Sequence, residues 1–276
     1  MTEYSAEEAD IEASRAPLLD HLMELRNRLL VACAAVLAGT VVCYLFAQRI
    51  YSILQLPYRD VVARMGGEEA LSELTFLVTQ PLEQFFTYMK LALVGGVAIA
   101  SPVLIWQLYA FVAPGLYRRE RAAVAPFLLA APVMFALGGM FVYYVALPFA
   151  FVFALGMQGE TAIPVELKPK VNEYFGFVTT LLLAFGACFQ LPVVLAILAK
   201  VGLVGATALR KGRRFAVVGI AAFAACFTPP DVVSMAIMAI PVYLLYEASI
   251  WLVWAIERAR LKSEAKLAEQ AGLAAP

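Results

Sequence analysis

Long apolar runs separated by polar stretches dominate the pattern along this chain. A backbone inside lipid must satisfy its own hydrogen bonds, and a helix does so within one segment, so each run is expected to be a transmembrane helix. A span needs about 20 residues to cross a hydrocarbon core of about 30 Å. The pattern predicts an all-α polytopic membrane protein with six spans, at residues 29–47, 87–110, 122–154, 174–199, 215–227 and 232–254.

Three of the runs have unusual lengths. The third is over-long and contains Pro126, Pro132 and Pro148, which predicts a tilt, a kink or a projection beyond the bilayer. The fifth, "FAVVGIAAFAACF", would cover only roughly 20 Å. If Glu247 lies at the inner interface, the sixth shortens to about 232–246 and matches the fifth. Spans five and six are therefore predicted to be short, which favours a locally thinned bilayer.

The distribution of lysine and arginine predicts the orientation. With the N-terminus inside, most of the 21 basic residues fall on the inner side, so the positive-inside rule places both termini in the cytoplasm. The first external segment, about 48–86, is expected to form a polar turn at "RMGG" and then a short surface helix. The other external connections are predicted at about 155–173 and at 228–231.

Composition supports the membrane prediction and excludes several function classes. The 276 residues are 63% hydrophobic and 15% charged, with no net charge, so nothing indicates a nucleic-acid partner. The four cysteines lie in apolar runs without metal-ligand spacing, and with one histidine neither a metal site nor a cofactor is expected. The acidic N-terminus has no cleavable signal pattern, and no GxxxxGK[ST] loop indicates an ATPase.

Two acids lie on the predicted cytoplasmic side. In "HLMELRNRLL", Glu24 precedes Arg28 by four residues, the favourable order for a helical ion pair. This segment is either an amphipathic lead-in with snorkelling charges or a binding element. Glu120 lies among Arg118, Arg119 and Arg121, where it either balances charge within the loop or binds a ligand. Together the two carboxylates could receive an arginine-rich ligand, because guanidinium binds carboxylate in a bidentate manner.

Three further polar residues lie in or beside the predicted spans: Gln190, Glu247 and Asp231. A polar residue inside a membrane is a functional candidate by default. Gln190 is equally compatible with a hydrogen bond between helices and with a partner-binding role.

Seven motifs, in order along the chain, resemble the TatC family, the core subunit of the twin-arginine protein translocase. They are "HLMELRNRLL", "QPLEQFFTYMKLAL", "SPVLIWQLYAFVAPGLYRRER", "LPFAF", "FGACFQLPVV", "LRKGRRFAVV" and "FTPPDVVSMAIMAIPVYLLYE". The resemblance covers about residues 18–254. It implies a cup-shaped protein of six helices in the cytoplasmic (inner) membrane, with both termini inside.

The resemblance also implies roles for individual residues. Glu24 and Glu120 match the two acids that engage the arginine pair of a signal peptide. The remaining residues assigned to signal-peptide binding are Arg26, Phe111, Pro114, Leu116, Tyr117 and Arg121. Gln190 matches an intramembrane position linked to contact with TatA or TatB, which is Glu in some members. The residues implied to shape the cup in the external loops are Pro57, Pro229, Pro230 and Asp231.

The predicted function is therefore binding and assembly without covalent chemistry. The protein is expected to bind twin-arginine signal peptides of folded precursors and to assemble with TatA, and TatB where present, for export driven by the proton-motive force. Self-association in a receptor complex is also expected. The alternative is a secondary transporter of a small molecule or ion. Residues 1–17 are predicted to be a disordered acidic tail, 18–258 the membrane domain and 259–276 a cytoplasmic tail.

Overall fold

The computed structural model describes residues 3–72, 74–112, 118–156, 168–200, 202–227 and 232–270. Side chains within these ranges are described from 22 to 111, at 127, from 129 to 232 and from 235 to 262. This described part is helical and has no strands, apart from one isolated bridge between Leu77 and Lys170. The elements are α1 (Glu3–Leu45), α2 (Ala47–Ser72), α3 (Glu83–Val112), α4 (Arg118–Phe141), a π-helical turn η1 (Val142–Ala146), α5 (Leu147–Gly156), α6 (Val171–Cys188), α7 (Leu191–Lys200), α8 (Ala206–Phe227) and α9 (Val232–Gln270).

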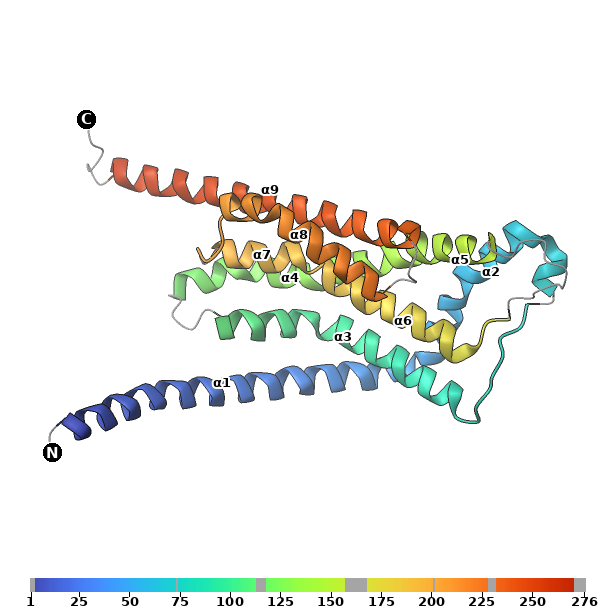
Figure 1. Cartoon of the computed structure of the whole chain (residues 1–276), viewed down its shortest axis with the longest axis horizontal. Coiled ribbons are helices and arrows are strands. Elements are labelled where there is room, and N and C mark those ends of the chain that lie inside the picture. Colours follow the sequence, from blue (N-terminus) through green and yellow to red (C-terminus); the bar gives the residue numbers. More distant parts are fainter. Residues whose placement is uncertain are drawn as a thin grey trace.

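The helices run lengthwise through an elongated bundle (Figure 1). Both termini lie at the same end, where α1 and α9 extend beyond the other helices, and α2 lies at the opposite end (Figure 1). Below, these are called the terminal end and the α2 end. Residues 3–17 and 259–270 of the two predicted tails belong to α1 and α9, and the division of the chain at residues 17 and 258 stays a prediction.

Five stretches are long and apolar enough to cross a membrane: Leu22–Leu45, Glu83–Phe111, Leu129–Gly156, Val171–Lys200 and Met235–Lys262. They confirm five of the predicted spans as apolar helices. The remaining prediction, 215–227, is the second half of α8, whose first half is strongly basic. A six-span topology therefore stays a prediction. A short sixth span also stays a prediction. The apolar stretch Met235–Lys262 is long, but it contains Glu247, at which the shorter span was predicted to end.

The first external segment contains more helix than the sequence predicted. Residues from Ala47 onward form α2, which buries Leu54, Tyr58 and Val61 at helical spacing. A helix that buries only one face does not give an unbroken apolar run, so a search for lipid-length runs misses it. The predicted polar turn is present, because Gly67 takes a left-handed φ of 70° and interrupts the helix.

Prolines divide the two longest of the predicted spans, 122–154 and 174–199. In the first, the Leu147 N–H donates to the Val142 carbonyl, a π-helical bond, directly before Pro148. Because Pro148 has no N–H, the regular bonding pattern cannot continue there, which accounts for the predicted irregularity. The other segment is predicted as one helix. In the structure α6 ends at Cys188 and α7 begins at Leu191, next to Pro192.

An aromatic cluster holds the α2 end together. Tyr58 of α2, Phe151 of α5 and Tyr174 of α6 have ring centroids 5.1–5.7 Å apart, and Tyr58 is 2% exposed. The Tyr174 hydroxyl donates to the Leu54 carbonyl at 2.7 Å. Burying a large apolar side chain is worth about 1.5–3 kcal/mol, and each aromatic pair adds about 0.5–1.5. This cluster fixes α2 against α5 and α6.

Two glycines allow α1 and α3 to cross closely. A Cβ atom on Gly39 would lie 2.8 Å from the Gly96 carbonyl oxygen, and one on Gly96 would lie 2.6 Å from the Thr40 nitrogen. Van der Waals packing drives helix association in lipid, and small residues let the two backbones approach. The crossing holds α1 against α3 and so positions the residues of α1 closer to its N-terminus.

Candidate functional site

Glu24 and Arg28 form an ion pair on α1, as their spacing predicts. Arg28 Nε donates to Glu24 Oε1 at 3.0 Å, and Arg28 Nη2 donates to the same oxygen. Arg28 Nη1 also reaches Gln107 Oε1 of α3 at 3.5 Å, so the pair lies against the second helix. The Glu24 side chain is 36% exposed and the Arg28 side chain 24%, which leaves the carboxylate accessible.

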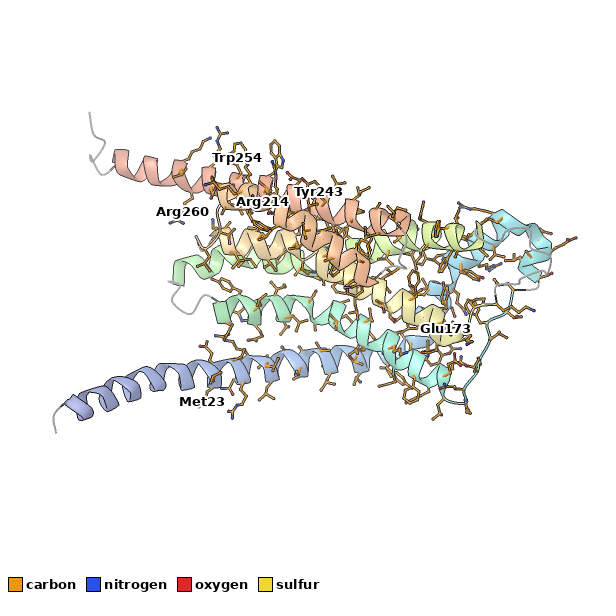
Figure 2. The ribbon with its side chains drawn as sticks, in the orientation of Figure 1. Met23, Glu173, Arg214, Tyr243, Trp254 and Arg260 are labelled. Atoms are coloured by element: carbon orange, nitrogen blue, oxygen red, sulfur yellow. The ribbon has the colours of Figure 1, made fainter. Side chains whose placement is uncertain are left out.

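The pair lies towards the terminal end. Met23, next to Glu24, is labelled there on α1, and α3 ends and α4 begins at the same end (Figure 2). Phe111, in the last turn of α3, is partly buried. Arg26 is exposed and donates to Asn27 Oδ1 at 3.2 Å, rather than to an acid. The structure thus brings Glu24 near α3.

The rest of the predicted recognition segment is not placed in detail. Glu120 and Arg121 belong to the first turn of α4, but their side chains lie outside the described residues. The segment with Pro114, Leu116 and Tyr117 also lies outside them. The two candidate acids thus belong to α1 and α4, and both of these helices contact α3.

Gln190 occupies the break between α6 and α7. Its N–H bonds to the Ala187 carbonyl at 3.0 Å, a tightened turn, and its Nε2 donates to the Ala131 carbonyl of α4 at 2.8 Å. This confirms the predicted hydrogen bond between helices. The residue is 9% exposed, and its Oε1 has no hydrogen-bond partner among the described residues. A buried, unpaired acceptor costs about 1–3 kcal/mol, so a donor from another molecule would be favourable here.

Glu83 is a buried acid that is not among the predicted site residues. Its Oε2 accepts bonds from the backbone N–H groups of Thr79 at 2.6 Å and Gln80 at 3.1 Å, and from the Thr79 hydroxyl. Its Oε1 accepts the Asn172 N–H at 2.7 Å, in the first turn of α6. One carboxylate therefore pairs with backbone N–H groups directly before α3 and in the first turn of α6. An acid directly before an apolar run was the available signal.

Glu247 pairs with α8. Its Oε2 accepts a bond from Arg213 Nη2 at 2.7 Å, and its Oε1 accepts one from the Tyr243 hydroxyl at 3.0 Å. Arg213 lies two residues before Phe215, where the apolar half of α8 begins, and Glu247 follows residues 232–246 of α9. The charged boundary of both helices therefore falls at the same level.

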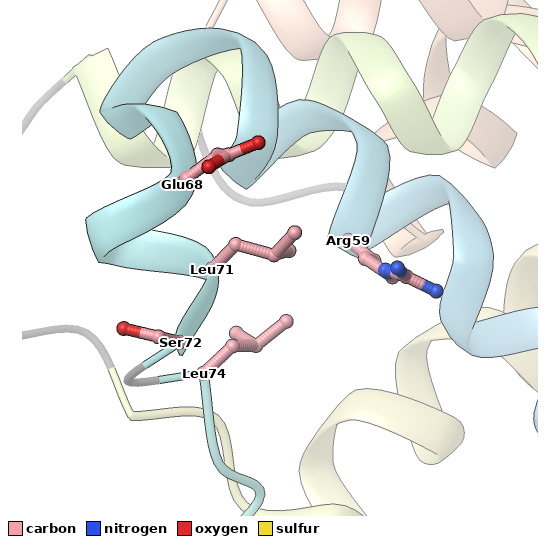
Figure 3. A pocket seen from close by; sticks show the side chains of 5 residues that line it. All are labelled: Arg59, Glu68, Leu71, Ser72 and Leu74. Atoms are coloured by element: carbon pink, nitrogen blue, oxygen red, sulfur yellow. The ribbon is translucent and has the colours of Figure 1, made fainter.

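The three external-loop residues Pro229, Pro230 and Asp231 lie outside the described residues. Pro57 is buried within α2. A pocket of about 490 Å³ at the α2 end is lined by Arg59, Glu68, Leu71, Ser72 and Leu74. In it the Arg59 and Glu68 side chains do not point toward one another (Figure 3). It contains none of the predicted site residues.

These features define a class of protein: a helical, multi-pass membrane protein with a partly exposed ion pair towards the end that carries both termini. The family described as "Sec-independent protein translocase protein (TatC)" matches residues 20–241. The chain belongs to the TatC family. It is thus a component of a protein translocase, in a family without enzymatic activity, and the alternative of a small-molecule transporter is not supported.

Individual relatives agree along most of the chain. The Sec-independent protein translocase protein TatC of Magnetococcus marinus is 40% identical over 266 residues, covering 96% of this chain and 93% of the relative. The TatC of Escherichia coli (strain K12) is 34% identical over 235 residues, covering 85% and 87%. Two crystal structures of the twin-arginine translocase receptor TatC are each 36% identical and cover 84% of this chain. They cover 97% and 98% of their own chains, with TM-scores of 0.70 and 0.71.

Proposed function

We propose that this translocase subunit binds twin-arginine signal peptides of folded precursor proteins at the cytoplasmic face. The observation that carries the proposal is the Glu24–Arg28 pair, an accessible carboxylate already engaged by a guanidinium. The description of its solved relatives as twin-arginine translocase receptors also supports it.

The proposed orientation places the terminal end in the cytoplasm, in the inner membrane. Arg214 and Arg260 lie toward that end (Figure 2). Because basic residues are enriched on the cytoplasmic side, this distribution favours the N-in, C-in arrangement. In this arrangement Glu24 faces the compartment in which precursors are made.

A ligand arginine would bind by displacing Arg28 from Glu24. The internal pair is partly exposed, and such pairs are typically worth at most about 1 kcal/mol. A guanidinium that makes bidentate, partly desolvated bonds to a carboxylate gains about 1.5–3 kcal/mol per bond. A ligand arginine can therefore replace Arg28, which keeps Gln107 of α3 as an alternative partner.

The second arginine of the ligand would require a second acid. Glu120 is proposed for this role, because α4 begins at the end of the bundle where α3 ends. The proposed site also includes Arg26, Phe111, Pro114, Leu116, Tyr117 and Arg121, as the family resemblance implies.

Two further proposals concern assembly. A transmembrane helix of TatA or TatB is proposed to donate a hydrogen bond to the unpaired Gln190 Oε1. The aligned charge boundary at Arg213 and Glu247 supports a short α8–α9 hairpin that completes a cup of six spans and thins the bilayer locally. Self-association in a receptor complex and coupling to the proton-motive force are proposed with them.

Site-specific cross-linking in membranes tests the signal-peptide proposal. Glu24→Ala and Glu120→Ala are each expected to reduce cross-linking to a twin-arginine precursor, and the double variant to abolish it, with membrane insertion unchanged. Glu68→Ala/Glu69→Ala, which removes two exposed acids of α2, is the matched control and should cross-link as the wild type does. Full cross-linking in the Glu24/Glu120 double variant would reject the proposed site.

A further inference from the structure

A basic and aromatic surface lies at the terminal end of α8 and α9. Its cationic residues are Lys200, Arg210, Lys211, Arg213, Arg214, Arg258, Arg260 and Lys262. Among the residues described between 191 and 262, the only acids are Glu247 and Glu257. The chain as a whole has no net charge, so this surface concentrates positive charge locally.

Both acids are already engaged. Glu247 binds Arg213 and the Tyr243 hydroxyl. Glu257 Oε1 accepts the Ala206 N–H at 3.1 Å, at the start of α8. Arg210, Lys211, Arg214 and Arg258 form no ion pair with a described side chain. The surface therefore carries uncompensated positive charge.

Two of these cations lie over aromatic rings at the edge of the apolar region, one over the exposed Phe215 and one over the partly buried Trp254. The Arg214 guanidinium lies 4.8 Å from the Phe215 ring centroid, and that of Arg258 lies 4.5 Å from the Trp254 ring. Phe215 and Trp251 are 68% and 67% exposed. Trp254 packs against the small core of Ala199, Ala206 and Val253, which fixes its position.

The positions of the cations along the axis of α8 match the depth of a lipid headgroup. The apolar half of α8 starts at Phe215, so at 1.5 Å per residue Arg214, Lys211 and Arg210 lie within about 8 Å beyond it. Tryptophan is enriched at this depth of a membrane. A ligand that fits must carry negative charge next to these cations and an apolar part next to Phe215 and Trp251.

We propose that the terminal ends of α8 and α9 form a binding site for an anionic phospholipid, with its phosphate at Arg210, Lys211 and Arg214 and its acyl chains along the exposed apolar half of α8. Arg258 contributes from α9. A soluble acidic segment would satisfy the charges but not the exposed rings beside them. The inference rests on the proposed membrane insertion of the α8–α9 hairpin and not on signal-peptide binding.

The test measures lipid binding by the purified full-length protein. Phosphatidylglycerol and phosphatidylcholine with identical acyl chains are titrated in detergent, and bound lipid is quantified by native mass spectrometry. The wild type should prefer phosphatidylglycerol. Arg210→Gln/Lys211→Gln/Arg214→Gln should weaken its binding about 5-fold per charge, about 100-fold in all. Arg49→Gln/Arg59→Gln/Arg64→Gln, which removes three exposed cations of α2, should bind as the wild type does.

Two further variants keep the result interpretable. Arg210→Lys/Arg214→Lys preserves charge and should retain most of the binding, and Lys211→Gln alone should weaken it about 5-fold even if the triple variant does not fold. Equal binding of both lipids by the wild type, or an equal loss in the α2 control, would overturn the proposal. Signal-peptide cross-linking through Glu24 does not enter this measurement, so the two proposals fail independently.

Discussion

Replacing Glu83 by glutamine should destabilise the fold strongly, although the side chain changes by a single atom. The residue is 4% exposed, and its two oxygens accept bonds from three backbone N–H groups and one hydroxyl. Glutamine keeps one oxygen and introduces an NH₂ donor. Whichever way the amide is turned, it faces at least one N–H donor and leaves that group unpaired.

The magnitude follows from the bonds. A hydrogen bond to a charged acceptor contributes about 1.5–3 kcal/mol, and a buried donor without a partner costs about 1–3. If glutamine keeps the oxygen toward Thr79 and Gln80, it loses the bond to Asn172 and weakens the others. We expect the free energy of unfolding to fall by about 2–4 kcal/mol. The contact between the start of α3 and the start of α6 should loosen first.

Unfolding by SDS in mixed micelles, followed by circular dichroism, measures this loss. Glu173→Gln is the matched control, because it removes the same charge nearby but from a side chain that is 71% exposed and paired only with Lys170. It should change the free energy of unfolding by less than about 1 kcal/mol. If Glu83→Gln were as stable as this control, the assignment of Glu83 as the residue that joins α3 to α6 would be refuted.

Three further experiments test the packing described above by the same unfolding measurement. Gly39→Ala places a Cβ 2.8 Å from the Gly96 carbonyl oxygen and should cost about 1–3 kcal/mol, whereas Gly219→Ala, with no atom within 4 Å, should cost nothing. Equal effects of the two would contradict the close α1–α3 crossing. Gln190→Leu removes one bond and one unpaired oxygen, so stability should change by less than about 1 kcal/mol. A larger loss would show that Oε1 is satisfied. A double-mutant cycle of Arg213→Gln and Glu247→Gln should give a coupling of at most about 1 kcal/mol, because Arg213 is 47% exposed. A coupling several-fold larger would place this pair in a desolvated environment.

The parts of the fold that depend on local spacing were predictable. Unbroken apolar runs identified the five long apolar stretches, and the four-residue spacing identified the Glu24–Arg28 pair. The hydrogen bond of Gln190 to a neighbouring helix was one of its two predicted roles.

The parts that depend on contacts between distant segments were not predictable. Helix α2 buries one face against α5 and α6, and a search for lipid-length apolar runs does not reveal that packing. Glu83 acquires its role from Asn172, which lies 89 residues later in the chain.

The α6–α7 break could have been foreseen, because Pro192 cannot donate the N–H that a continuous helix needs.

Equilibrium binding of a labelled twin-arginine signal peptide to the purified protein in nanodiscs tests the central claim most directly. The wild type should bind the twin-arginine peptide more tightly than its twin-lysine counterpart, because only guanidinium makes the bidentate bond. Glu24→Gln/Glu120→Gln should lose this preference and bind at least about 100-fold more weakly, since each lost charged bond is worth about 1.5–3 kcal/mol. An unchanged dissociation constant and an unchanged preference for arginine in that variant would contradict the proposed recognition site.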